Sequence, residues 1–95
     1  MDVTEKVIEA LEIVAKKRYP VDQFCVKGYQ EESVCLQYED GVWCIYTGER
    51  GNRYNEVKCD TVLSAALEFI RHLTGRREDI SAMENELIQI IANAA

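Results

Sequence analysis

Apolar and polar residues alternate along two neighbouring stretches in the middle of the chain, residues 33–39 and 42–48. Strict alternation is typical of β-strands that bury one face and expose the other. Asp40 and Gly41 lie between the two stretches, and this dipeptide favours a two-residue hairpin turn with positive φ at both residues. Such a turn fixes which residues are paired across the hairpin. The side chains expected on the core face are Val34, Leu36, Tyr38, Trp43, Ile45 and Thr47.

The opposite face of this hairpin carries Cys35, Gln37, Glu39, Val42, Cys44 and Tyr46. A third alternating stretch, residues 53–59, follows a connection that is rich in turn-forming residues. A connection of even length would turn Val57 toward solvent and the charged Glu56 toward the core. We therefore predict a connection of odd length, which buries Val57 and leaves Tyr54 and Glu56 beside Tyr46.

Apolar residues recur at helical spacing in most of the remaining chain. The predicted elements are a helix over residues 3–18, strands over 22–29, 33–39, 42–48 and 53–59, and helices over 61–74 and 78–92. Short connections between consecutive strands favour an antiparallel meander, and only one of its faces is apolar. The prediction is a single α+β domain over residues 1–95: a four-stranded antiparallel meander sheet with one N-terminal and two C-terminal helices packed on one face.

The chain is acidic, because 17 Asp and Glu residues outnumber 11 Lys and Arg residues and give a net charge of −6. This charge disfavours nucleic-acid binding, which needs a basic surface to displace counterions from phosphates. It favours a partner protein that is itself basic. The acidic N-terminus does not resemble a signal peptide, and no apolar run reaches the ~20 residues of a membrane span. We therefore expect a cytoplasmic protein that does not enter a membrane.

No motif in the sequence indicates catalysis or metal binding. The four cysteines lie inside predicted strands without a Cys-x-x-Cys pair, and His72 is the only histidine. Zinc sites and redox dithiols need closer spacing or more ligands. His72 has no nucleophile or acid at motif spacing, and it suits the end of a helix as a partner of the helix dipole. We expect free thiols, no cofactor, no metal and no enzymatic activity.

Residues 39–53 read Glu-Asp-Gly-Val-Trp-Cys-Ile-Tyr-Thr-Gly-Glu-Arg-Gly-Asn-Arg. This stretch resembles a pattern of small bacterial immunity proteins from polymorphic-toxin and contact-dependent growth inhibition systems. In that pattern an acidic-Gly turn precedes Trp, an aliphatic-Tyr pair, an Arg-Gly loop and a Thr-capped or acidic helix start with an early alanine. Asp60-Thr61 and Ala65-Ala66 approximate the last part, so the resemblance runs from Glu39 to about Ala66 and covers about a third of the chain.

Two positions depart from that pattern, because Gly48 stands where Ser is usual and Cys59 replaces a bulky aromatic residue. The resemblance implies a single-domain cytoplasmic protein that binds and blocks one cognate toxin, often a nuclease. It implies no catalytic residues.

A surface for such a partner is predicted on the sheet face opposite the helices, where tyrosines lie among acidic residues. The candidate partner-binding residues are Tyr29, Glu31, Glu32, Gln37, Glu39, Tyr46, Tyr54 and Glu56. Two other hypotheses stay open. One is a homo-oligomeric scaffold, in which a second copy covers the apolar stripe of the last helix. The other is a small enzyme or metal protein that uses the cysteines. If the protein binds a toxin, we expect it to be a monomer or a weak homodimer when alone.

Overall fold

The computed structural model describes residues 3–75 and 80–93, and its elements confirm the predicted α+β class. In chain order they are α1 (Val3–Arg18), a 3₁₀ turn (Val21–Gln23), β1 (Phe24–Cys25), β2 (Ser33–Glu39), β3 (Val42–Glu49), β4 (Asn52–Cys59), α2 (Val62–Thr74) and α3 (Ile80–Asn93). The predicted start of the last helix at residues 78 and 79 lies outside the described residues.

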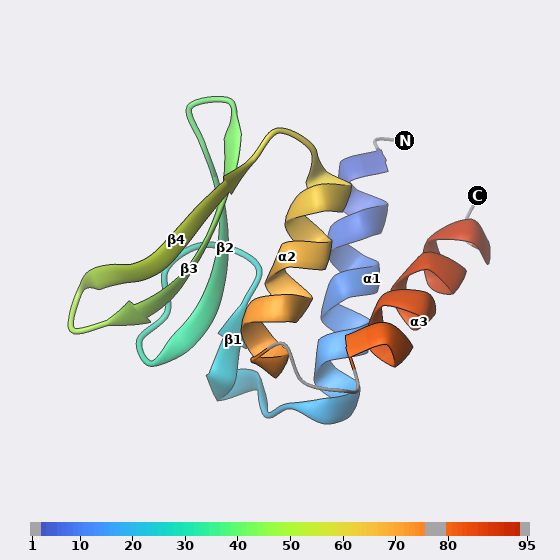
Figure 1. The fold of residues 1–95 in the computed structure, drawn as a ribbon, viewed down its shortest axis with the longest axis horizontal. Coiled ribbons are helices and arrows are strands. Elements are labelled where there is room, and N and C mark those ends of the chain that lie inside the picture. Colours follow the sequence, from blue (N-terminus) through green and yellow to red (C-terminus); the bar gives the residue numbers. More distant parts are fainter. Residues whose placement is uncertain (1–2, 76–79, 94–95) are drawn as a thin grey trace.

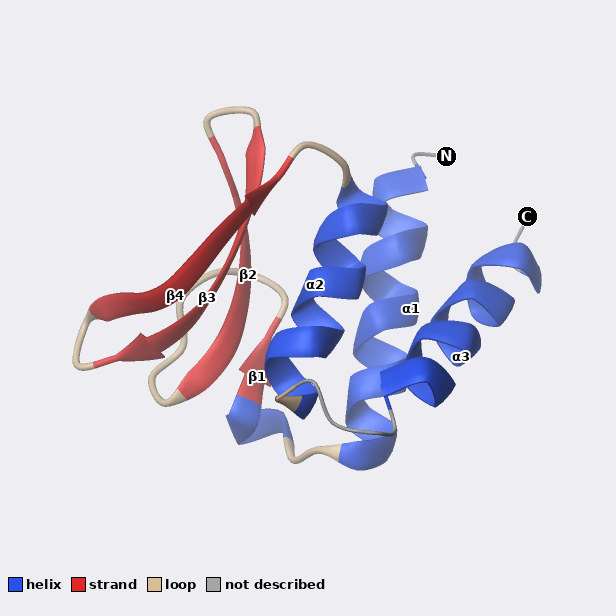
Figure 2. Ribbon diagram, viewed as in Figure 1, coloured by secondary structure: helices blue, strands red, loops and turns tan. Residues whose placement is uncertain are grey.

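All three helices lie on one side of the sheet, as predicted (Figures 1 and 2). α2 packs directly on β2, β3 and β4, whereas α3 packs on α1 and α2. The core between these layers is formed by buried side chains of the three helices and of β1, β2 and β3, including Leu11, Phe24, Leu36, Ile45, Phe69, Ile70, Met83 and Leu87. No helix of the described residues is long and apolar enough to cross a membrane.

Residues with known capping preferences lie at both ends of α2. Thr61 adopts an extended conformation, and its side chain accepts a hydrogen bond of 3.1 Å from the backbone N–H of Ser64. Such a cap satisfies one of the amides that the first helical turn leaves without a partner. Gly75 ends the helix in the left-handed region with φ 68°, which glycine adopts without a steric penalty.

The prediction that all four strands are antiparallel is wrong for the first one. β1 has only two residues and runs parallel to β2, with Phe24 opposite Val34. Parallel neighbours usually need a long crossover. Here a loop over residues 26–32 carries the chain back to the level of Phe24, so that β2 starts in the same direction as β1. Gly28 adopts φ +119° in this loop, and the Gln30 side-chain amide donates to the Phe24 carbonyl and to Ser33 Oγ. A periodicity argument does not detect these side-chain hydrogen bonds.

The hairpin of β2 and β3 has the predicted register. Its turn residues Asp40 and Gly41 have φ values of 52° and 83°. The ladder between the two strands is uninterrupted from its first pair, Ser33 opposite Gly48, to its last pair at the turn. Tyr38 therefore lies opposite Trp43 as expected, with the two rings 4.8 Å apart between centroids.

The hairpin of β3 and β4 differs from the prediction, because its connection has even length. Glu49 pairs with Asn52 across a two-residue turn, Arg50–Gly51. Val57 nevertheless lies opposite Ile45 on the core side, because the ladder is shifted between Ile45 and Thr47. Asn55 adopts φ 56° at this shift and acts as the extra residue of a β-bulge.

Tyr54 lies on the side of the sheet opposite to the one that was expected. This residue pairs with Thr47 before the bulge, so the two side chains share the helix-facing side of the sheet. Tyr54 does not lie beside Tyr46 on the opposite face. The prediction failed because it treated β4 as a regular strand, in which one parity holds along its whole length.

Candidate protein-binding surface

The sheet face that points away from the helices, here called the outer face, has a small core of its own. Tyr46, Cys35 and Cys44 are fully buried on this face, and Val42 packs against them. Tyr46 was expected to be an exposed contact residue, and this part of the prediction is wrong. It is covered on one side by the stacked ring of Tyr29, 6.3 Å away between centroids, and on another by the guanidinium of Arg53, 4.6 Å from the ring centroid.

The Tyr46 hydroxyl is held within this small core. It donates a hydrogen bond of 2.6 Å to the side-chain carbonyl of Gln37. Burial raises the pKa of Tyr46 to about 12, since a phenolate would have to form away from water. The side chain is therefore a structural support for the outer face, and its neighbours form the accessible surface.

A polar clamp ties the loop over residues 26–32 to the turn of the second hairpin. The Tyr29 hydroxyl donates to the Glu31 carboxylate and accepts a 2.7 Å hydrogen bond from the Gly51 N–H. Glu31 also accepts a 3.0 Å hydrogen bond from the Arg50 N–H. The bond from Tyr29, followed by those from the two turn amides, lowers the pKa of Glu31. The clamp joins residues far apart in sequence and fixes an acidic loop in one position.

Arg53 links the carboxylates of the outer face. Its guanidinium lies 3.0 Å from Glu39 and 2.9 Å from Glu56, and it also donates to Gln37 at 3.3 Å. The hydrogen bonds and charge of Arg53 lower the pKa of Glu39. Sequence analysis missed this residue, because a regular strand with Tyr54 and Glu56 beside Tyr46 puts Arg53 on the helix-facing side. The even-length connection instead pairs Arg53 with Gly48 on the face of Tyr46.

Gly48 is a second residue that the sequence analysis did not recognise as important. A Cβ atom there would lie 2.7 Å from the carbonyl oxygen of Gln30 and 2.8 Å from the Tyr29 ring. The missing side chain thus lets the loop over residues 26–32 pack tightly on β3. The only available signal in the sequence was a glycine within an alternating strand, which often indicates a close approach of another backbone.

The structure brings most of the predicted partner-binding residues together. The outer face and its adjoining loop carry Tyr29, Glu31, Glu32, Gln37, Glu39, Tyr46 and Glu56, and the helix-facing side carries Tyr54. Tyr29, Glu31 and Glu32 are exposed, whereas Gln37 and Glu39 are half-buried. An acidic rim with one exposed tyrosine therefore surrounds a buried aromatic centre.

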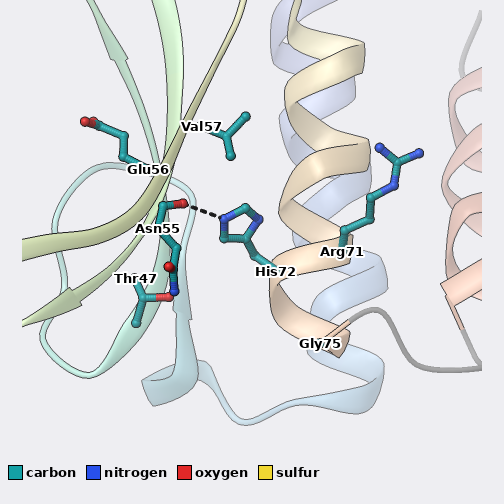
Figure 3. Close-up of a pocket in the computed structure, with 7 residues that line it drawn as sticks. All are labelled: Thr47, Asn55, Glu56, Val57, Arg71, His72 and Gly75. Carbon is teal, nitrogen blue, oxygen red and sulfur yellow. Dashed lines mark hydrogen bonds between the residues drawn. The ribbon is translucent and has the colours of Figure 1, made fainter.

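The only histidine lies in a separate cleft of about 510 Å³ between β4 and α2 (Figure 3). Its Nε2 lies 2.9 Å from the carbonyl oxygen of Asn55, and its Nδ1 lies 3.0 Å from that of Glu68. Arg71 extends away from the ring and pairs with Glu68 at 3.3 Å. Both ring nitrogens of His72 face backbone oxygens, and Nδ1 also lies 3.5 Å from the Glu68 carboxylate, so the ring ties the β-bulge to α2.

Three of the four cysteine thiols have a raised pKa. Burial raises the pKa of the Cys35, Cys44 and Cys59 thiols, which keeps them protonated and weakly nucleophilic. All four cysteines are free thiols. Within residues 3–75 and 80–93, no group of three or more His, Cys, Asp or Glu residues is arranged to hold a metal ion.

Comparisons of the chain with models of known protein families, with curated proteins and with solved structures find no match.

Proposed function

We propose that this protein is a non-catalytic binding protein that neutralises a basic bacterial toxin by forming a stoichiometric complex in the cytoplasm. The observation that supports the proposal most directly is the polar clamp on the acidic loop. Tyr29 and Glu31 fix this loop against the turn at Gly51, so Glu32 is presented on a rigid support. A binding surface that is already ordered costs less conformational entropy when the partner docks.

The charges of the surface agree with a basic partner. Glu32 is exposed at the loop, and two carboxylates, Glu39 and Glu56, share the single guanidinium of Arg53. The whole chain has a net charge of −6. Acidic groups at an interface raise the rate of association with a basic protein and select against acidic competitors.

Tyr29 is the aromatic contact that this surface offers. Its side chain is 42% exposed, and its hydroxyl is fixed by Glu31 and Gly51. Tyrosine is enriched among the residues that dominate binding energy at interfaces. Tyr46 supports this surface from beneath, and Tyr54 contributes only to a partner that reaches around the edge of β4.

The proposal is tested with the toxin domain encoded beside the gene of this protein, if the neighbouring reading frame ends in a basic domain. We expect a one-to-one complex and loss of toxin activity when the two proteins are mixed. A neighbouring basic toxin that is neither bound nor inhibited contradicts the proposal.

A charge-matched pair of variants tests the surface. Glu32→Gln on the loop and Gln89→Lys on α3 both change the net charge by one unit at exposed positions. We expect the first variant to slow association several-fold and to weaken its dependence on salt, with little effect of the second. Equal effects of the two variants would place the interface elsewhere.

A homo-oligomeric scaffold is the second candidate function, and two exposed isoleucines favour it. Ile13 on α1 is 46% exposed and Ile88 on α3 is 48% exposed. Light scattering on the isolated protein distinguishes the two functions. A stable dimer that dissociates after Ile88→Lys supports the scaffold, whereas a monomer supports the binding protein.

A further inference from the structure

The edge of β2 that points away from β3 is paired with another strand only at its beginning. β1 ends at the pair of Cys25 with Cys35, and β2 continues beyond it toward the hairpin turn (Figure 1). The Gly28 N–H donates to the carbonyl oxygen of Leu36, so the backbone groups of Leu36 point to this edge. Because backbone groups alternate along a strand, the N–H and C=O of Tyr38 point to the same edge. No strand of the described residues pairs with Tyr38 there.

A groove of about 420 Å³ lies along this uncovered edge, between β2 and α1. Its wall and floor include Ile8 of α1, Val26, Leu36 and Trp43. Tyr38 lies at its rim with 59% of its side chain exposed and its ring tilted against Trp43. Exposed aromatic residues next to an apolar cavity are typical of sites that accept a side chain of a partner.

The surroundings of this edge groove are acidic. A second hollow of about 260 Å³ shares Ile8, Val26 and Lys27 with it, and is lined by three carboxylates of α1, namely Glu5, Glu9 and Glu12. Glu12 pairs with Lys16 at 3.9 Å, whereas within the described residues no ion pair involves Glu5 or Glu9. Lys27 is the cationic side chain that lines the groove itself.

We propose that the edge groove binds an extended segment of a partner protein that carries an apolar residue and basic residues on the same side, two residues apart. The segment lies beside β2 in the place that a longer β1 would occupy, and its backbone pairs with the N–H and C=O of Tyr38. One apolar side chain enters the cavity floored by Ile8 and Trp43, and Lys or Arg side chains two residues away, which point to the same side of the strand, reach Glu5 and Glu9. Addition of a strand to an exposed sheet edge is a general mode of peptide recognition. This site shares only Gln37 with the candidate residues of the outer face, so each proposal can fail without the other.

The test uses a fluorescently labelled synthetic peptide that repeats Lys-Ser-Val-Ser, with a peptide that repeats Glu-Ser-Val-Ser as the control. We expect the basic peptide to bind and the acidic peptide not to bind. In NMR spectra the amide of Tyr38 shifts on binding and exchanges more slowly with solvent. Absence of binding, or amide changes confined to the outer edge of β4, would overturn the proposal.

Three variants separate the groove from general charge attraction. Glu5→Gln/Glu9→Gln is expected to weaken binding of the basic peptide about tenfold at low salt. The matched variant Asp22→Asn/Glu49→Gln removes the same number of charges at other exposed positions and is expected to bind almost normally. Lys27→Gln removes the cation from the groove and is expected to tighten binding several-fold. Since damage to the fold does not produce tighter binding, an unchanged or weaker affinity of Lys27→Gln contradicts the proposal.

Discussion

The two hairpins that share β3 have almost the same turn but different support. Both turns have two residues with positive φ, 52° and 83° at Asp40–Gly41 and 53° and 78° at Arg50–Gly51. The first hairpin continues as a regular ladder along its whole length. The second contains a β-bulge at Asn55, and the amides of its turn are bound by side chains from the loop over residues 26–32.

This difference shows where local sequence determines a hairpin and where distant residues take part. In the first hairpin, the turn dipeptide and the alternating pattern specify the same register. In the second, the turn length alone would expose Val57, and the bulge restores its burial. The β3–β4 hairpin is therefore expected to respond to substitutions in the loop over residues 26–32, whereas the β2–β3 hairpin is expected to respond mainly to loss of its core contacts.

The largest expected effect contrasts the two neighbours of Ile45 on the core side. Leu36 is fully buried in β2, whereas Val57 in β4 is only partly buried. Leu36→Ala is expected to lower the free energy of unfolding by about 2–5 kcal/mol, because it leaves a cavity in the core. Val57→Ala is expected to cost about 1 kcal/mol, since fewer contacts are lost. Urea unfolding of both variants measures the difference, and equal losses would contradict the contrast.

The next effect concerns the packing of the loop on β3. Gly48→Ala is expected to destabilise the protein by about 1–3 kcal/mol, because the new methyl group meets the backbone of Gln30. Gly41→Ala, in the first turn, has open space around the added methyl group and meets only the cost of positive φ. The Gly51 amide should exchange its hydrogen faster in Gly48→Ala than in the parent protein, and at the parent rate in Gly41→Ala. Unaltered protection of that amide would mean that the loop does not hold the second turn.

A smaller effect is expected at the bulge. Asn55→Val places a β-branched residue at φ 56° and is expected to cost about 1–2 kcal/mol. Asn55→Gly keeps the conformation accessible and is expected to change stability by less than about 0.5 kcal/mol. Thermal unfolding compares the two variants. If both lose the same stability, the side chain of Asn55 matters more than its backbone conformation.

The smallest effect is electrostatic and depends on pH. The pKa of Glu31 is lowered in the folded protein, so its ionised form stabilises the fold at neutral pH. This contribution is present above the unfolded pKa and is lost as the pH falls through the lowered, folded value. Glu31→Gln is thus expected to be less stable than the parent protein near pH 7 and equally stable near about pH 2. Denaturant unfolding at both pH values is the measurement, and a difference that persists in acid would point to lost packing.

Sequence reasoning found the features that depend on neighbouring residues. The register of the first hairpin and the bounds of the helix predicted over residues 61–74 both follow from residues close in the chain. It missed features that depend on long-range contacts. The hydrogen bonds of Gln30 hold a loop where a strand was expected. The two-residue turn places Tyr54 on the helix-facing side, and the bulge at Asn55 returns Val57 to that side. On the candidate surface the acids were found, but the covering of Tyr46 by Arg53 and Tyr29 was not.

The position of Trp43 has a practical consequence for spectroscopy. It is the only tryptophan of the chain, it lies against Tyr38, and it is paired with Cys59 on β4. Its fluorescence accordingly comes from one site at which the second hairpin and the edge groove meet. A nearby thiol quenches indole emission, so separation of β4 from β3 should brighten the signal. Filling of the groove should shift the emission to shorter wavelength by excluding water from the ring. One unlabelled chromophore can thus follow both events.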